Sequence, residues 1–587
     1  MSARIEDYAL LGDGETAALL HRNGSIDWLC WPRFDDDACF AALLGSNENG
    51  HWSLRPVGQV LNINRRYQLD TLIVETDFEL AEGTVRIIDF MPPRADYSSI
   101  VRIVVGLRGT VEMRSTLRLR FDYGALSPWA RECGLGITAT VGPNTVAFHA
   151  PVAVHSHSDA TYADLTISRD DRFAFVLRYG PANESPPPNI NAEAALRATQ
   201  DYWQGWIAKF DNTKSDWPAA VRRSLIVLKA MIHQKTGGLV AAPTTSLPEM
   251  PGGDMNWDYR YCWLRDASFT MGALIASGFH VEAEAWKTWL LRAIAGAPDK
   301  IRIMYRVDGA RHLNEWTVDA LDGYRSSLPV RIGNAASTQH QVDVVGEVLN
   351  CLYLAREGGL SASTAERDIE RQLVEHIEAI WQTKGSGIWE ARSMPRHYTY
   401  SKVMAWVGVD RVLRGAQADS HGHETIARLE HLRQTIHDDV CENGWNAGLG
   451  CFTQYYGGQC IDASLLLLPV VDFLPADDPR IASTISVIQR ELSEDGLIRR
   501  NKALVDGPNE GTFLACSCWM ADCLYLQGKT AEAGAQFERV LSVANDLGLL
   551  SEQYNVPGAH LSGNFPQALT HLAIVNTASR LSAPRVL

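Results

Sequence analysis

The chain has 587 residues, more than one hydrophobic core accommodates, so we expect two to four structural units. It carries 54 basic and 69 acidic residues, and this net charge of −15 argues against nucleic acid or an anionic membrane as a partner. Hydrophobic residues make up 46% and charged residues 21%, which is ordinary for a soluble globular protein.

The N-terminus and the cysteines indicate the compartment. The first residues lack the apolar core of a signal peptide, and no stretch approaches about 18 consecutive apolar residues, so we expect no membrane span. The 11 cysteines form no C-x-x-C pair, and Cys516-Ser-Cys518 is too weak a pattern for a metal site. These features predict a cytoplasmic protein with mostly reduced, buried cysteines and no metal or other cofactor.

Residues 1–188 are predicted to form an antiparallel β-sandwich. Asn23-Gly24 lies between two apolar runs, as in a hairpin turn. Asp35–Asp37, Trp28 and Trp31 are the only residues here that we expect near a neighbouring pocket. Further strand-like runs recur about every ten residues, separated by turn residues, which is typical of a sandwich. They lie at 71–80, 84–90, 100–107, 116–121, 138–148 and 173–179.

The second half of the chain is predicted to be helical. Pro186–Pro188 marks a break, and residues 189–214 are predicted to be a linker helix between the two units. Residues 215–587 show helical periodicity without a fixed repeat length, which favours a closed ring of inner and outer helices over a solenoid. The predicted helices are 215–234, 264–277, 281–296, 341–356, 364–382, 398–415, 423–440, 459–468, 479–492, 512–526, 530–546 and 566–580. The long loops between them should gather at one end and hold the active site.

One stretch, Asn256–Asp266, has an unusual composition. It combines four aromatic residues, two arginines and two aspartates in eleven residues. Unpaired buried charges are costly, so the mixture suits a pocket in which aromatic faces stack on a sugar ring and charged groups bind its hydroxyls. A buried Arg–Asp pair with aromatic packing at a helix start would look the same, and the two interpretations are compatible.

Two loop glutamates fit the needs of glycosidic bond cleavage, which uses one protonated and one ionised carboxyl group. Glu390 follows Trp389, and an indole removes water from the carboxyl group, which raises its pKa and keeps its proton. Glu552 has the polar neighbours Ser551, Gln553 and Tyr554, which can support an ionised base. Loop glutamates are more often simply solvated, so these residues alone leave the assignment open.

Several longer motifs resemble glycoside hydrolase family 15, which contains glucoamylases, glucodextranases and bacterial trehalases. The resemblance spans nearly the whole chain. The motifs are Gly24-Ser-Ile-Asp-Trp-Leu-Cys-Trp-Pro-Arg-Phe34, Tyr259-Arg-Tyr-Cys-Trp-Leu-Arg-Asp266, Gly323-Tyr-Arg-Ser-Ser-Leu-Pro-Val-Arg-Ile-Gly-Asn334 and Gly563-Asn-Phe-Pro-Gln567. The family implies an N-terminal β-sandwich followed by an (α/α)6 barrel over residues 215–587, and hydrolysis with inversion at the anomeric carbon.

The resemblance also assigns roles to individual residues. Glu390 matches the general acid and Glu552 the general base. Where fungal glucoamylases have a second Glu after the acid, this chain has Ala391, which puts the preference beyond the first subsite in doubt. The residues matched to sugar binding are Arg265, Asp266, Tyr259, Trp263 and Trp389, with Trp316, Arg331, Arg499 and Glu510 as weaker candidates.

The expected activity is exo-acting release of β-glucose from a small sugar substrate. Without a starch-binding module, short malto- or isomalto-oligosaccharides are the favoured substrates, and α,α-trehalose is the named alternative. A carbohydrate-binding protein that has lost catalysis is the alternative from another class, although both carboxylates argue against it. An inverting phosphorylase would have a phosphate site in place of Glu552.

Overall fold

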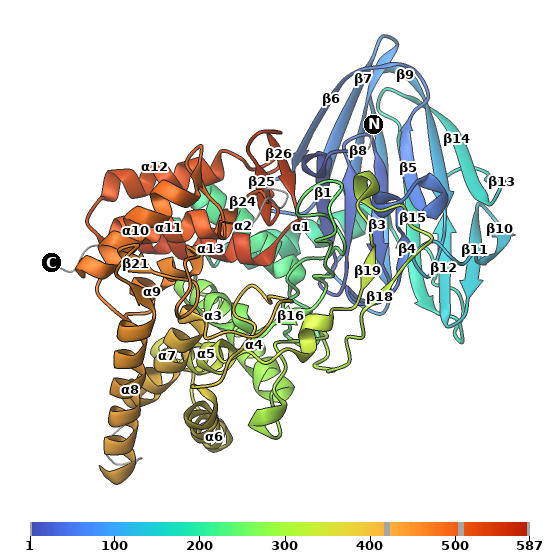
Figure 1. Cartoon of the computed structure of the whole chain (residues 1–587). Helices are drawn as coiled ribbons and strands as arrows, with labels where there is room; N and C mark the ends of the chain where they lie inside the picture. Colours follow the sequence, from blue (N-terminus) through green and yellow to red (C-terminus); the bar gives the residue numbers. More distant parts are fainter. Residues whose placement is uncertain (1–2, 416–422, 503–509, 584–587) are drawn as a thin grey trace.

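Fifteen strands precede the first long helix and form two antiparallel sheets that share one strand, β9 (Ser98–Arg118) (Figure 1). The structure is a computed structural model that describes residues 3–415, 423–502 and 510–583. The first sheet has the order β1-β2-β3-β5-β9-β14-β13, with β4 on β3. Its strands are β1 (Tyr8–Gly12), β2 (Ala17–His21), β3 (Ser25–Cys30), β4 (Ala38–Phe40), β5 (His51–Pro56), β13 (His155–His157) and β14 (Ala160–Ser168).

The second sheet has the order β6-β7-β8-β9-β15-β12-β11-β10. Strand β7 shows why these residues form half-buried strands, because Val74, Thr76, Phe78 and Leu80 are buried and alternate with acidic residues. The strands are β6 (Val60–Tyr67), β7 (Val74–Leu80), β8 (Gly83–Phe90), β10 (Trp129–Cys133), β11 (Gly136–Val141), β12 (Asn144–His149) and β15 (Arg172–Pro181).

Two sequence-based strand boundaries in this unit are wrong. The runs at 100–107 and 116–121 belong to the single strand β9, whose first half pairs with β15 and whose second half pairs with β14 and β5. Gly109 has φ 66°, and a Cβ atom at Gly106 would lie 2.0 Å from the Ser168 carbonyl oxygen, so glycines allow the strand to pass from one sheet to the other. Conversely, the run at 138–148 is a hairpin of β11 and β12 that turns at Gly142.

Helix α1 (Ala192–Ile207) joins the sandwich to the helical unit. The Asn191 side chain caps its first turn by accepting a hydrogen bond from the Ala194 amide. Leu196 packs against apolar residues of β8, β9 and β15. On the helical side, the Trp206 ring stacks on Phe279 with centroids 4.1 Å apart and donates a hydrogen bond to Glu282. The helix therefore contacts both units.

In the part of the chain that the structure describes, twelve further helices alternate between an inner and an outer ring, as the periodicity predicts. The inner helices neighbour one another in a closed circle and are buried on most sides, which is the (α/α)6 barrel. They are α3 (Ala267–Ala276), α5 (Asp343–Glu357), α7 (Thr399–Gly415), α9 (Leu467–Val470), α11 (Leu514–Leu526) and α13 (Ala568–Ser582). The outer helices are α2 (Pro218–Met231), α4 (His280–Ala293), α6 (Thr364–Ile380), α8 (His423–Asn443), α10 (Pro479–Leu492) and α12 (Thr530–Leu541).

Short strand pairs brace the loops that precede the inner helices. They are β16 (Cys262–Trp263) with β17 (Met304–Tyr305), β18 (Trp316–Thr317) with β19 (Arg331–Ile332), β20 (Trp445–Asn446) with β21 (Cys451–Phe452), β22 (Ser493–Glu494) with β23 (Leu497–Ile498), and β24 (Thr512–Phe513) with β25 (Gln553–Asn555) and β26 (His560–Ser562). The predicted helix at 459–468 is a 3-10 turn, Ala463–Leu466, that leads into the short α9.

The cysteines match the prediction of unpaired and mostly buried thiols. All 11 cysteines are free, and most are buried, with Cys133 exposed. Among the residues that the structure describes, no helix is long and apolar enough to cross a membrane.

Candidate active site

A cavity of about 490 Å³ opens at the end of the barrel where the inner helices begin. Residues within 249–263, 334–336, 386–398 and 454–460 line it, together with Arg500, Asn501 and Glu510. Several of the long loops that precede the inner helices therefore meet here, as the sequence predicts. Glu249, Glu390 and Glu510 place three carboxyl groups in the wall, and Trp257, Tyr259 and Trp389 add aromatic faces. Mixed polar and aromatic walls of this size suit a small sugar.

The stretch at 256–266 contributes to the cavity with alternate side chains. Trp257 and Tyr259 line the cavity, whereas Asp258 and Arg260 are fully buried on the other side as an ion pair of 2.7 Å. Arg260 also donates hydrogen bonds to the Asp36 carbonyl oxygen (2.8 Å) and the Tyr123 hydroxyl (2.9 Å), both in the sandwich. The buried Arg–Asp pair is therefore confirmed on one side of the chain, while sugar binding by the cavity side stays a prediction.

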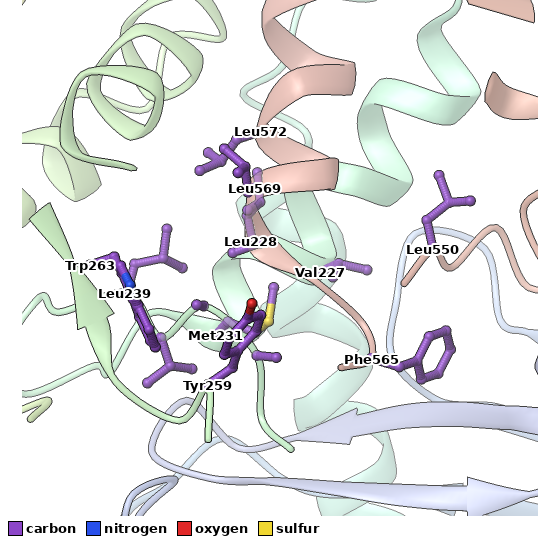
Figure 2. Close-up of a cluster of buried hydrophobic side chains, with 14 of the residues drawn as sticks. Val227, Leu228, Met231, Leu239, Tyr259, Trp263, Leu550, Phe565, Leu569 and Leu572 are labelled. Carbon is purple, nitrogen blue, oxygen red and sulfur yellow. The ribbon is translucent and has the colours of Figure 1, made fainter. Parts of the chain in front are cut away.

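Apolar packing fixes the aromatic residues of this wall. Figure 2 shows Tyr259 and Trp263 in one cluster with Met231 of α2 and Leu569 of α13. The Tyr259 and Trp263 rings also meet edge to face, with centroids 5.2 Å apart. Their positions are therefore set by the core of the barrel and do not depend on a ligand.

Glu390 is held by the residues that the motif places beside it. Its Oε1 accepts hydrogen bonds from Arg265 Nη1 (2.8 Å) and Trp263 Nε1 (3.1 Å). Its backbone has φ 50°, an unfavourable value for a residue with a Cβ atom, and Gln339 Nε2 donates to its carbonyl oxygen (3.0 Å). Burial raises the pKa of Glu390 to about 7; Arg265 opposes this rise and Asp266 adds to it. A carboxyl group with this pKa can donate a proton near neutral pH.

Glu552 is buried next to the wall. It lies just before β25, and its Oε1 accepts a hydrogen bond of 2.7 Å from the Tyr259 hydroxyl. Burial raises the pKa of Glu552, while Arg500 and the Tyr259 hydroxyl oppose that rise. Gly563, with φ 77°, leaves room for the carboxylate, because a Cβ atom there would lie 2.7 Å from Glu552 Oε2. The positive φ of Gly563 therefore lets the backbone pass close to the carboxyl group of Glu552.

A carboxylate network centred on Arg500 lies next to Glu552; Arg500 belongs to a long loop that the sequence marks, but it is not among the residues matched to sugar binding. Arg500 donates hydrogen bonds to Glu510 (2.6 Å) and to Glu249, and Gln553 Nε2 donates to Glu249 (2.8 Å). Burial raises the pKa of Glu249 to about 8, with Arg500 opposing the rise. Glu249 lies in a loop without a motif, so only the fold reveals its position. Arg499, the neighbour of Arg500, is matched to sugar binding by the family resemblance, so the same loop signal also pointed to Arg500.

Of the other predicted binding residues, Trp389 and Glu510 line the cavity, whereas Arg265 and Asp266 lie buried beside Glu390. Trp389 Nε1 donates a hydrogen bond to Asp462 at 3.0 Å, which orients the indole. Arg265 Nε donates to Asp266 Oδ1 at 2.8 Å. These residues are therefore brought together around one pocket, as the motifs predict.

Trp316 and Arg499 do not lie at the cavity. Trp316 has 46% of its surface exposed and packs edge to face on Tyr123 of the sandwich, because β18 turns its side chain outward. Arg499 pairs with Glu494 of β22 at 2.6 Å, which directs it away from Arg500. Arg331 lies behind the wall, with its guanidinium carbon 4.4 Å from the Trp257 ring centroid.

The sandwich residues that the sequence places near a neighbouring pocket contact the barrel outside the cavity. Asp35 bonds to Arg306 Nε at 2.8 Å, and Trp28 Nε1 donates to the Pro243 carbonyl oxygen at 2.8 Å. They join the sandwich to the barrel and do not line the cavity. Among the residues at 3–415, 423–502 and 510–583, no cluster of three or more His, Cys, Asp or Glu is arranged to hold a metal ion.

Comparison with known protein families shows to which family the chain belongs. Residues 218–579 match glycosyl hydrolases family 15, and residues 1–203 match the trehalase-like N-terminal domain. The chain belongs to glycosyl hydrolases family 15. The family resemblance in the sequence is thus confirmed, and the protein is a glycoside hydrolase.

Relatives match the chain over nearly its whole length. It is 32% identical to a trehalase of Thermoplasma volcanium, covering 98% of this chain and 93% of that protein. It is 35% identical to a trehalase of Mycolicibacterium smegmatis, covering 97% and 90%. The structure of a bacterial glucoamylase complexed with acarbose superposes with a TM-score of 0.74 over 99% of this chain and 94% of that one. At 13% identity this shows the shared fold, a β-sandwich followed by an (α/α)6 barrel.

Proposed function

We propose that this family 15 hydrolase is a trehalase, which cleaves α,α-trehalose into two glucose molecules with inversion at one anomeric carbon. The sequence analysis favours short malto- or isomalto-oligosaccharides, with α,α-trehalose as the named alternative. The observation that carries the proposal is the identity of 32–35% to trehalases over nearly the full length of each chain, sandwich included. The likeness to a glucoamylase supports the fold and leaves the substrate open.

Glu390 is the proposed general acid. It would give its proton to the glycosidic oxygen, so that the second glucose leaves as a neutral alcohol. Its pKa of about 7 supports this role, since the carboxyl group keeps its proton in neutral solution. Arg265 and Trp263 both donate to the same oxygen, Oε1, which leaves Oε2 to carry the proton.

Glu552 is the proposed general base. It would take a proton from a water molecule as the water attacks C1 from the face opposite the leaving oxygen. The Tyr259 hydroxyl and the nearby Arg500 stabilise the ionised carboxylate. Glu249, whose pKa is about 8, would stay protonated, so that Arg500 is shared by fewer negative charges. Inversion requires a gap of about 6.5–9.5 Å between the two carboxyl groups, wide enough for the water.

Product stereochemistry tests both substrate and mechanism. Only one C1–O bond of trehalose breaks, so inversion yields one β-glucose from the attacked ring and one α-glucose from the leaving ring. We expect proton NMR at early times to show equal amounts of the two anomers before mutarotation. Two α-glucose molecules would overturn inversion and the role of Glu552. Rapid release of glucose from maltose or isomaltose, with trehalose left intact, would overturn the trehalase proposal and restore the oligosaccharide reading.

A further inference from the structure

A charged aromatic cluster lies beside the cavity and contributes two residues, Trp257 and Arg392, to its wall; the role proposed for it rests on the proposed hydrolysis of trehalose. The cluster comprises Trp257, Arg392, Glu315 and Arg331. The guanidinium carbons of Arg392 and Arg331 lie over the Trp257 ring, 4.0 and 4.4 Å from its centroid. Such contacts stabilise both partners and fix their relative orientation.

Glu315 ties the two arginines together. It forms a two-point pair with Arg392, with N–O distances of 2.6 and 3.1 Å, and it lies 3.6 Å from Arg331 Nε. Its own Oε2 accepts a hydrogen bond of 3.0 Å from the Ala335 amide. Two-point pairing restricts the Arg392 guanidinium to one plane and leaves its Nε–H free to donate elsewhere. Arg392 is therefore preoriented before a ligand arrives.

The position of the cluster relative to Glu390 suggests what it binds. Arg392 follows Glu390 by two residues, with only the small Ala391 between them, and Trp257 precedes Tyr259 by two. Trp257, Ala391 and Arg392 all line the cavity. The leaving sugar is bonded to the oxygen that Glu390 protonates, so its nearest hydroxyls must lie close to the residues beside Glu390.

The chemistry of that sugar differs between the candidate substrates. In trehalose the leaving glucose is attached through its own C1, so its C2 hydroxyl and ring oxygen flank the scissile bond. In maltose it is attached through O4, so its C3 hydroxyl and bulky C6 hydroxymethyl group flank that bond. A rigid donor close to Glu390 can therefore distinguish the two sugars by what lies next to the scissile oxygen.

We propose that Trp257 and Arg392, oriented by Glu315, bind the leaving glucose and select trehalose over maltose. Trp257 presents apolar indole surface to the cavity and holds Arg392 over its ring, and Arg392 donates to a hydroxyl next to the scissile oxygen. Glu315 is a positioning residue, since it acts through Arg392. None of the three takes part in the Tyr259–Glu552 and Arg265–Glu390 contacts, beside which the attacked glucose would lie in this proposal.

Comparing trehalose with a substrate that lacks a leaving sugar distinguishes binding of the leaving glucose from a purely structural role of the cluster. α-Glucosyl fluoride presents the same attacked glucose as trehalose but has no leaving sugar, so it does not need the cluster. For Arg392→Ala and Trp257→Leu we expect kcat/KM for trehalose to fall about 10- to 100-fold, the scale of a hydrogen bond to a charged group. We expect kcat/KM for the fluoride to stay within about 3-fold of wild type. Glu315→Gln should show the same pattern more weakly.

Arg499→Ala is a matched control, because Arg499 pairs with Glu494 away from the cavity; neither substrate should be affected. If the variants lose both substrates equally, or lose neither, the cluster does not bind the leaving sugar and the inference is overturned, while the trehalase proposal stands. If wild-type protein hydrolyses the fluoride and maltose but not trehalose, the proposed function fails, and the inference fails with it.

Discussion

Replacing Glu390 with glutamine should separate the roles of the two carboxyl groups. The leaving glucose of trehalose departs from a poor leaving oxygen and needs a proton, whereas fluoride leaves without one. The Glu390→Gln variant should therefore lose trehalose hydrolysis and keep most of its activity on α-glucosyl fluoride. Glu552→Gln should lose both, since each substrate needs an activated water.

The contacts of Glu390 indicate that glutamine would fit in its place, so the loss of rate should reflect the missing proton. The two donors on Glu390, Arg265 Nη1 at 2.8 Å and Trp263 Nε1 at 3.1 Å, both reach Oε1 and can bond equally to an amide oxygen. The substitution then removes the proton and little else. General acid catalysis contributes about 10²–10⁴-fold, so kcat for trehalose should fall by that factor, or about 3–5 kcal/mol in barrier height. The fluoride rate should stay within about 10-fold of wild type.

The assay compares initial rates of glucose release from trehalose and from α-glucosyl fluoride at one pH, with thermal unfolding as a check on folding. Glu494→Gln, in the ion pair with Arg499 outside the cavity, is the control and should change neither rate. Equal losses on both substrates in Glu390→Gln would refute the acid assignment. Retained hydrolysis of the fluoride in Glu552→Gln would refute the base assignment.

Three further predictions follow from the same contacts. Because Glu390 must be protonated and burial raises its pKa to about 7, kcat/KM for trehalose should fall as the pH rises above about 7, and a rate profile for the fluoride should lack this limb. Gly563→Ala should lower both activity and the melting temperature, since its Cβ atom would meet Glu552 Oε2 at 2.7 Å where φ is 77°; a variant with wild-type kinetics would contradict the tight fit. Arg260→Met should reduce the free energy of unfolding in urea by about 3–5 kcal/mol, because it leaves the Asp258 carboxylate buried without its partner, and adding Asp258→Asn should recover part of the loss.

The helical unit could be predicted closely because its signal is local. Each helix has an apolar period that neighbouring residues determine, and the predicted run at 479–492 coincides with α10. The sandwich was harder, because a strand's extent depends on partners far along the chain. Gly106 and Gly109 look like a break in a strand, yet in β9 they let one strand serve two sheets.

In the candidate site, local motifs likewise identify some residues, whereas only the tertiary fold places others. Glu390 and Trp263 are each marked by a local motif, and the structure brings them into contact. Arg499 and Arg500 are adjacent, and only the pairing of Arg499 with β22 decides which of them faces the cavity. Glu249 has no motif at all, and its position near Glu552 follows from the tertiary fold.

The alternation at 257–260 gives the sandwich a part in the active site. Side chains of an extended chain point in opposite directions in turn, so fixing Asp258 and Arg260 on one side also fixes Trp257 and Tyr259 on the other. Arg260 is fixed by the Asp36 carbonyl oxygen and the Tyr123 hydroxyl of the sandwich, and Tyr259 in turn donates to Glu552. The proposed base is therefore linked to the sandwich through Arg260, the peptide bond that joins it to Tyr259, and the Tyr259 hydroxyl. A barrel without its sandwich would lose the Asp36, Tyr123 and Cys30 acceptors that orient the Arg260 guanidinium and would expose that group to water, which is a physical reason for both units to occur in one chain.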